Sequence, residues 1–285
     1  MMQQTTLNCR GRLLDLSTPV VMGILNVTPD SFFDGGRHDD PGHALRQAEK
    51  MIREGARIID VGGASSRPGA ETVPEEEELR RVVPLVSQLA AAFPEIILSV
   101  DTWRARVARE AAAAGVGILN DISAGRMDDN LYPEVAKSGL PYVLMHMQGT
   151  PATMQQAPVY DDVVTEVLDF FIAEIGRLRA LGVNDIVLDP GFGFGKTVEH
   201  NYRLLNHLSL FTSVTGLPVL AGISRKSMIC KVLRVNPENA LNGTTALHMV
   251  ALQQGAKILR AHDVKEAMEV IRLWEAVEAG KTQLS

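Results

Sequence analysis

The strongest constraint on the fold is an eightfold alternation of short apolar segments with longer amphipathic ones. The short segments are rich in Val, Ile and Leu and are not cleanly alternating, as expected of parallel strands that are buried on both faces. The strand candidates are residues 20–25, 57–61, 96–100, 117–120, 142–145, 185–188, 218–221 and 257–259. A largely parallel sheet is therefore predicted.

A helical stretch follows every strand candidate. The helix candidates are residues 44–54, 75–92, 105–114, 131–138, 161–181, 198–215, 240–254 and 264–279. Eight strand–helix units predict an α/β fold, a single (β/α)8 TIM barrel with residues 1–285 as one domain. The alternative is a doubly wound open sheet, which the count of eight and the lack of a second-domain linker disfavour. Residues 5–15 predict a short N-terminal hairpin that caps the barrel floor.

Composition excludes several classes of protein. Hydrophobic residues make up 46% of the chain and charged residues 22%, which is enough for a large core. The formal net charge of -6 argues against a surface that coats nucleic acid. Neither a signal peptide nor a bilayer-spanning run is visible. Cys9 and Cys230 are far apart and outside any CxxC pattern, so we expect a cytoplasmic protein without nucleic-acid or membrane partners.

Polar residues stand where the predicted strands end. In a barrel all these positions surround the C-terminal mouth, where βα-loops build active sites. Such carboxylates can also cap the following helices, but this many around one rim favours a site. The residues are Asn26, Asp60, Asp101, Asn120, Asp121 and Asp189.

Basic residues gather after the last two strand candidates. Arg225 and Lys226 follow the seventh, and Arg260 and His262 follow the eighth. The loops after these two strands form the usual phosphate-binding corner of the fold, so an anionic ligand is predicted. A solvated basic loop is the alternative.

Two near-motifs carry no function by themselves. Residues 191–197, GFGFGKT, resemble a P-loop, but Pro190 stands where the Walker pattern requires glycine. A rim loop that lets the backbone approach a ligand is the better interpretation. His146 has no HExxH partner, which favours a structural histidine over a metal ligand.

Taken together, the rim segments resemble the dihydropteroate synthases. The matching segments are residues 26–32 (NVTPDSF), 62–69 (GGASSRPG), 99–102 (SVDT), 120–123 (NDIS), 145–149 (MHMQG), 189–194 (DPGFGF), 224–227 (SRKS) and 260–262 (RAH). They occur in order and span nearly the whole chain. Each is weak alone, but the set is highly specific.

The resemblance implies a pterin-binding barrel that condenses 6-hydroxymethyl-7,8-dihydropterin pyrophosphate with p-aminobenzoate. The products are 7,8-dihydropteroate and pyrophosphate, released by an SN1-like step. It implies that Asp101, Lys226 and Arg260 are catalytic. The pterin-binding positions are Asp101, Asn120, Met145, Asp189, Phe194 and Lys226.

Further roles follow from the same resemblance. Pyrophosphate would bind Asn26, Ser66, Arg260 and His262, with Mg²⁺ as cofactor on Asn26. The p-aminobenzoate slot would be formed by Phe32, Ser66, Arg67, Pro68, Lys226 and Ser227. Ser227 and nearby N–H groups would hold the carboxylate at a helix N-terminus.

The sequence departs from the family pattern at three positions. Ala64 stands where glutamate is frequent, Ser66 where threonine is common, and Phe33 where a small residue is usual. These changes bear on affinity for p-aminobenzoate. We expect a homodimer formed through helices late in the barrel. A methyltetrahydrofolate-dependent corrinoid methyltransferase and a non-catalytic pterin-binding protein stay open as alternatives.

Overall fold

The computed structural model describes residues 3–27, 41–64, 73–151, 153–154 and 158–282. The parallel strands within these residues are β3 (Val20–Asn26), β4 (Ile58–Gly62), β5 (Ile97–Asp101), β6 (Ile118–Asp121), β7 (Tyr142–Met145), β8 (Ile186–Asp189), β9 (Leu220–Ala221) and β10 (Ile258–Ala261). They form one eight-stranded sheet in the order β8-β7-β6-β5-β4-β3-β10-β9. A parallel bridge between Leu188 and Val219 joins the two ends of the sheet. The predicted barrel is confirmed, and the open-sheet alternative is wrong.

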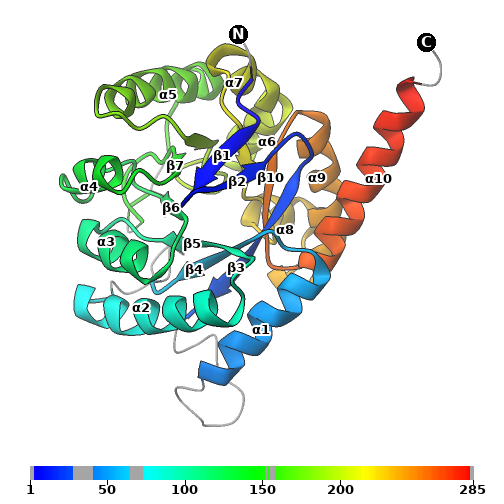
Figure 1. Cartoon of the computed structure of the whole chain (residues 1–285). Helices are drawn as coiled ribbons and strands as arrows, with labels where there is room; N and C mark the ends of the chain where they lie inside the picture. The colour runs from blue at the N-terminus through cyan, green and yellow to red at the C-terminus, as the bar shows by residue number, and fades with distance from the viewer. Residues whose placement is uncertain (1–2, 28–40, 65–72, 152, 155–157, 283–285) are drawn as a thin grey trace.

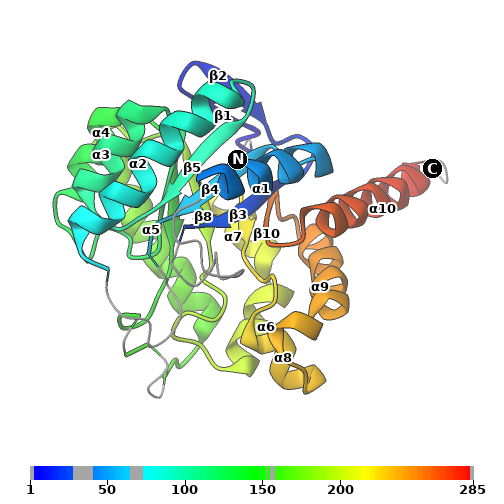
Figure 2. The same ribbon diagram turned by 90° about the horizontal axis from the view of Figure 1, so that it is seen from below.

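Helices surround the strands (Figure 1). They are α1 (Pro41–Glu54), α2 (Glu75–Ala92), α3 (Ala105–Ala114), α4 (Leu131–Ser138), α5 (Val163–Ala180), α6 (Val198–Asn206), α7 (Leu208–Thr215), α8 (Ser227–Leu233), α9 (Leu241–Gln253) and α10 (Val264–Thr282), with a 3-10 turn η2 (Pro237–Asn239). Figure 2 shows α10 projecting from the barrel towards the C-terminus. No helix in the described ranges has both the length and the apolar character that a membrane span requires.

Two helix predictions need correction. The single helix predicted over residues 198–215 is wrong, because the chain breaks at His207, which ends α6 and begins α7 with φ -114°. The break redirects the chain so that Leu208 and Phe211 are fully buried. Helix α8 was not predicted, since its seven residues are too few to display a helical period.

Alternation along each strand separates two parts of the core. In β4, Ile59 and Val61 pack outward in the large cluster beneath the helices, whereas Ile58 belongs to a cluster at the barrel floor. Because side chains alternate along a strand, Asp60 points inward like Ile58. The same alternation points Asp101, Asn120, Asp189 and Arg260 into the barrel interior.

The N-terminal hairpin closes the floor of the barrel, as predicted. Strands β1 (Thr6–Cys9) and β2 (Arg12–Asp15) pair antiparallel. Leu7 and Leu14 join the floor cluster together with the first inward residues of the barrel strands. The backbone N–H of Asn8 donates to Asp185 Oδ2 at 2.7 Å, at the entry to β8. The opposite end of the barrel is left for ligands.

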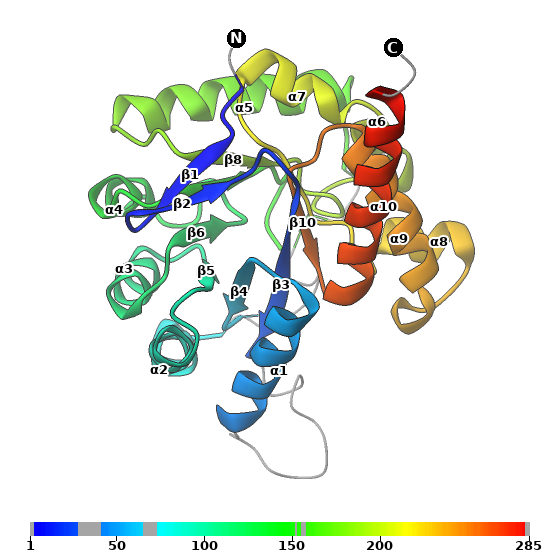
Figure 3. The same ribbon diagram turned by 45° about the vertical axis from the view of Figure 1, so that its right-hand side comes forward.

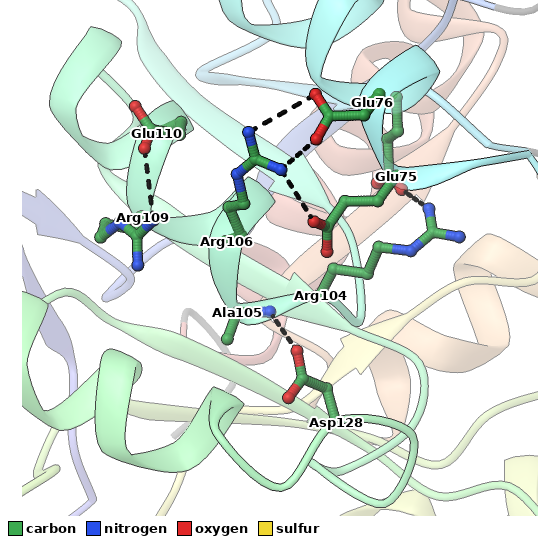
Figure 4. A network of polar contacts seen from close by, with 9 residues as sticks. Glu75, Glu76, Arg104, Ala105, Arg106, Arg109, Glu110 and Asp128 are labelled. Atoms are coloured by element: carbon green, nitrogen blue, oxygen red, sulfur yellow. Dashed lines mark hydrogen bonds and ion pairs between the residues drawn. The ribbon is translucent and has the colours of Figure 1, made fainter.

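Side chains also tie helices α2 and α3 together at their N-terminal ends (Figure 4). Arg106 pairs with Glu75 at 3.2 Å and with Glu76. Asp128, from the loop after β6, accepts a hydrogen bond from Ala105 N at 2.8 Å and so caps α3. These ion pairs are exposed to solvent and screened by salt, so they contribute little to stability.

Candidate active site

A hydrogen-bonded cluster of charges lies inside the barrel mouth. Arg260 Nε donates to Asp60 Oδ2 at 2.7 Å, and its Nη2 donates to Asp101 Oδ2 at 2.7 Å. Asn120 Nδ2 donates to the same Asp60 Oδ2 at 2.9 Å. The structure therefore brings together three predicted site residues, Asp101, Asn120 and Arg260, from three different strands.

Burial controls the ionisation of this cluster. Burial raises the pKa of Asp101 to about 7, with Asp60 adding to the shift and Arg260 opposing it. Burial alone would lower the pKa of Arg260, but Asp60 and Asp101 hold it above its ordinary value. Arg260 thus stays cationic between two carboxylates, and the N–H groups that these two bonds do not use are available to a ligand.

Asp60 is a residue whose importance the sequence analysis missed. It was noted only as a polar residue near a strand end, yet its side chain is fully buried and holds both Arg260 and Asn120. Its second oxygen, Oδ1, has no hydrogen-bond partner among the described residues. Its spacing could have revealed this role from the sequence. Asp60 follows Ile58 by two residues, and this spacing places both side chains on the inward face of the barrel strand.

Asp189 and Lys226 form the other charged pair of the mouth. Asp189 Oδ1 accepts a hydrogen bond from Gly191 N at 2.8 Å. Its Oδ2 and Lys226 Nζ both border Gly222, at 3.6 and 3.7 Å from the Cβ that another residue would have there. Burial raises the pKa of Asp189, an effect that Lys226 opposes. A carboxylate acceptor and an ammonium donor therefore face the same small space.

Lys226 is held by the loop after β8. Its Nζ donates to Phe192 O and lies 4.7 Å from the centre of the Phe194 ring. Burial lowers the pKa of Lys226 to about 8, although Asp189 and Asp101 favour its charged form. The predicted pterin-binding residues Phe194, Lys226 and Asp189 are thus neighbours.

An apolar wall adjoins these charges. Met145, predicted as apolar cover, belongs to a small buried cluster with Ile122 and Met147, against which Phe194 and Trp103 pack. Trp103 and Met147 were not predicted as part of the site. Phe194 connects this cluster to Lys226, so a flat ring held by Lys226 would lie beside sulfur and aromatic groups.

In the predicted anion corner, Ser224 and His262 are hydrogen-bonded to each other. Ser224 Oγ lies 3.0 Å from His262 Nδ1, and His262 N donates to Ser224 Oγ at 3.2 Å. Arg225 does not join them, because its guanidinium pairs with Asp263 at 2.7 Å and donates to the carbonyls of Pro237 and Glu238. Its predicted place in the anion site is therefore wrong, whereas Arg260 and His262 lie at the rim as expected.

Asp121 holds the turn that follows β6, and within the described residues the structure gives it no contact with the charged cluster. Its Oδ1 accepts from Ser123 N and its Oδ2 from Gly125 N, both at 2.7 Å. The Tyr142 hydroxyl donates to Oδ2 at 2.7 Å as well. All these bonds stabilise the turn and the neighbouring strand β7. Helix α4 begins only at Leu131, so Asp121 does not cap it.

Asn26, the predicted magnesium ligand, lies at the end of β3 beside Gly62. Its Oδ1 lies 3.3 Å from the Cβ that another residue would have at Gly62, next to Asp101 Cβ at 3.7 Å. An amide oxygen beside a carboxylate is suitable for a hard cation. Across the described ranges, no group of three His, Cys, Asp or Glu side chains could hold a metal ion. A Mg²⁺ ion held by the amide oxygen of Asn26 would therefore have to take most of its ligands from water and phosphate.

The p-aminobenzoate slot can be placed only in part. Ser227 is exposed at the first residue of α8, directly after Lys226. The other predicted positions, Phe32, Ser66, Arg67 and Pro68, lie outside the described residues. Ser227 and Lys226 show where the slot would meet the pterin site.

The fold and the mouth define a class of protein, an α/β-barrel enzyme that holds a polar heterocycle and an anion at the strand ends. The family described as pterin binding enzyme matches residues 22–262. Dihydropteroate synthase of Escherichia coli K12 is 51% identical over 274 residues, covering 95% of this chain and 96% of the relative. The chain therefore belongs to the pterin-binding enzymes and, within them, to the dihydropteroate synthase family.

Solved structures agree with this assignment. Yersinia pestis dihydropteroate synthase in a sulfonamide drug complex is 49% identical with a TM-score of 0.90, covering 96% of this chain and 99% of that one. The Xanthomonas albilineans enzyme with 4-aminobenzoic acid is 45% identical with a TM-score of 0.90, covering 96% and 98%. A structure of that enzyme with 7,8-dihydropteroate is 43% identical with a TM-score of 0.87, covering 96% and 99%.

Proposed function

We propose that the chain is a transferase that joins 6-hydroxymethyl-7,8-dihydropterin pyrophosphate to p-aminobenzoate. The observation that carries the proposal is the cluster of Asp101, Asn120 and Arg260 beside Asp189 and Lys226 in one barrel mouth. Relatives of nearly full length carry the same activity in their names, and one has been solved with 4-aminobenzoic acid and with 7,8-dihydropteroate.

The pterin is expected to bind between the apolar wall and the charged cluster. Asp189 would accept the paired N–H donors of the ring, since a carboxylate only accepts. Asn120 donates from Nδ2 to Asp60, so its Oδ1 remains as an acceptor towards the ligand. Met145 and Phe194 would cover the ring, and Lys226 would donate to the ring carbonyl.

The pyrophosphate is expected to lie over Arg260 and His262, with Ser66 as a further predicted contact. Asn26 would give an amide oxygen to Mg²⁺. When bound, Mg²⁺ would neutralise charge on the leaving pyrophosphate. Arg260 would add a fixed cation on the same side.

The chemical step we propose breaks a C–O bond. Its electron pair leaves with pyrophosphate, and the methylene carbon becomes a cation delocalised into the pterin. Asp101 would stabilise that positive charge. The neutral amine of p-aminobenzoate then forms the C–N bond and loses one proton. Because an aniline nitrogen is uncharged near neutral pH, no strong catalytic base is required.

The deciding experiment mixes both substrates with Mg²⁺ and measures pyrophosphate and 7,8-dihydropteroate together. Equal amounts of the two products are expected. Methyl transfer to a corrinoid protein without pyrophosphate would instead support the methyltransferase alternative. Tight pterin binding with neither product would support a non-catalytic protein, an outcome disfavoured by the presence of Asp101, Lys226 and Arg260.

We further propose a homodimer and a location in the cytoplasm. Helices α8 and α10 carry the exposed apolar side chains of Val232, Leu233, Leu273 and Val277. These lie on the late helices that the sequence analysis expected to pair. Cys9 and Cys230 are free thiols, which fits a reducing compartment.

A further inference from the structure

A buried lysine ties together the two near-motifs that the sequence left without a function. Lys196, the lysine of GFGFGKT, has a side chain that is 3% exposed. Its Nζ lies 3.0 Å from His146 Nδ1 and 3.3 Å from His146 O. It also lies 3.1 Å from Gly191 O and 3.0 Å from Phe194 O. One amine thus reaches four polar atoms on two loops of the mouth.

Every one of these four atoms can act as an acceptor. Three are carbonyl oxygens, which only accept, and an ammonium group has three N–H donors to offer. Burial also lowers the pKa of Lys196 well below its ordinary value, so the direction of its contact with His146 Nδ1 depends on which group carries the proton. The contacts with the three carbonyl oxygens need Lys196 as the donor in either state. Burial lowers the pKa of His146 to about 2, with Lys196 and Arg126 adding to the effect, so the ring is neutral. Lys196 therefore acts as the donor that joins the loop after β8 to the end of β7.

The glycines of the same motif make this contact possible. Gly191, Gly193 and Gly195 have φ of +69°, +82° and +62°, a region that side chains rarely adopt. A Cβ at Gly191 would lie 1.9 Å from His146 O, and one at Gly195 would lie 2.4 Å from Gln148 O. The alternating glycines thus let the loop lie directly against the chain after β7, where Lys196 fastens it.

The fastened loop carries the groups that hold Lys226. Phe192 O accepts from Lys226 Nζ, and the Phe194 ring lies 4.7 Å from it. We propose that Lys196 is a positioning residue of the synthase site, which fixes residues 191–195 so that Phe192 O and the Phe194 ring hold Lys226 against the pterin. The inference rests on the proposed function for the identity of the ligand. Lys196 itself need not touch that ligand.

The test measures pterin binding without turnover. Lys196→Met keeps the length of the side chain and removes its donors. The dissociation constant for 6-hydroxymethylpterin, measured by calorimetry, should rise tenfold or more. Lys137→Met is the matched control, because Lys137 is exposed in the last turn of α4, at the floor end of the barrel. The dissociation constant of this variant for 6-hydroxymethylpterin should stay within twofold of the wild-type value.

A double-mutant cycle separates positioning from general stability. If Lys196 acts through the loop, then Lys196→Met in a Phe194→Ala background should weaken binding by no more than twofold to threefold further. The proposal would be overturned if the fold-change in the dissociation constant of the double variant equalled the product of the two single fold-changes. Unchanged binding in Lys196→Met would also overturn it, and the melting temperature does not enter either criterion.

A second variant covers the case in which Lys196→Met does not fold. His146→Phe removes the contact between Nδ1 and Lys196 but keeps a ring against Phe170. It should weaken 6-hydroxymethylpterin binding by at least threefold, and a change under twofold would overturn the proposal. Because none of these measurements needs product formation, a wild type that binds pterin but releases no pyrophosphate would reject the proposed function alone.

Discussion

Single residues in the mouth act mainly through their charge in a buried setting. Asp60, Asp101 and Asp189 supply three carboxylates. Arg260 donates to the first two, and Lys226 borders Gly222 together with Asp189. A buried charge without a partner has a large desolvation cost, so the ligand is expected to pair with the charges that the protein leaves unpaired. A pterin with N–H donors and a pyrophosphate with anionic oxygens would do so on opposite sides.

The ionisation of Lys226 predicts how activity depends on pH. Because burial lowers its pKa to about 8, the residue is a cation below that pH and becomes neutral above it. We expect kcat/KM to fall as the pH rises through about 8, since this profile reports the free enzyme. Lys226→Arg stays protonated, so whatever activity it keeps should show no decline up to about pH 10. A flat wild-type profile, or the same decline in Lys226→Arg, would contradict the assignment.

Asp60 and Asn120 should be exchangeable as a pair. Asn120→Asp places two carboxylates in contact, and Asp60→Asn weakens the hold on Arg260, so each should reduce pterin affinity by about 1–3 kcal/mol. The double exchange restores one donor and one acceptor and keeps an oxygen facing the ligand. Calorimetry should show that it regains most of the loss seen in Asn120→Asp. Losses that simply add would mean that the two residues act independently.

At the scale of elements, the barrel keeps stability and chemistry at opposite ends. The hairpin β1–β2 packs its apolar side on the floor cluster, while the predicted ligand contacts lie at the strand ends. The loop after β8, by contrast, contacts a predicted site residue directly, because Phe192 O and the Phe194 ring hold Lys226. Its fixed shape depends on Lys196 and on the positive φ of its glycines.

This separation predicts a substitution that affects stability alone. Leu7 is fully buried on the floor, so Leu7→Ala should lower the free energy of unfolding by about 2–5 kcal/mol. The turnover per folded molecule should not change. Leu13, in the same hairpin, is 73% exposed, and Leu13→Ala should change stability by less than about 0.5 kcal/mol. Urea unfolding and pyrophosphate release measure the two effects, and a drop in kcat for Leu7→Ala would show that the floor is coupled to the mouth.

At the scale of the whole molecule, the exposed apolar residues of the late helices predict self-association. Helices α8, α9 and α10 gather on one side of the barrel, away from α5 (Figure 3). Leu273 is 62% exposed and Val277 50% exposed, although both are large and apolar. Residues of this kind gathered on one side are typical of a protein interface.

Sedimentation can test this prediction directly. The wild type should sediment as a dimer, and Leu273→Glu combined with Val277→Glu should sediment as a monomer, because two carboxylates would have to be buried in the interface. Ile172→Glu, on α5, is the matched control, since Ile172 is 50% exposed and lies on another side. A monomeric wild type, or a dimer that the double change leaves intact, would contradict the prediction.

Much of this architecture was predictable from local sequence pattern. All eight strands and the floor hairpin were expected within a few residues, because apolar runs and turn residues act over short distances. The strand-end rule also placed Asp101, Asn120, Asp189 and Arg260 at one mouth, since parallel strands share a carboxyl edge. The ordered rim segments then indicated the family.

Tertiary structure alone decided which of these groups became partners. Asp60 and Arg260 are 200 residues apart, and Lys196 and His146 are 50 apart. Arg225 and Lys226 are neighbours in sequence, yet Arg225 turns to Asp263 while Lys226 faces the mouth. The hydrophobic periodicity of a sequence predicts only which face of its own helix or strand a side chain occupies. A hydrogen bond also requires the partner's position, which depends on how the whole barrel closes and how its loops pack.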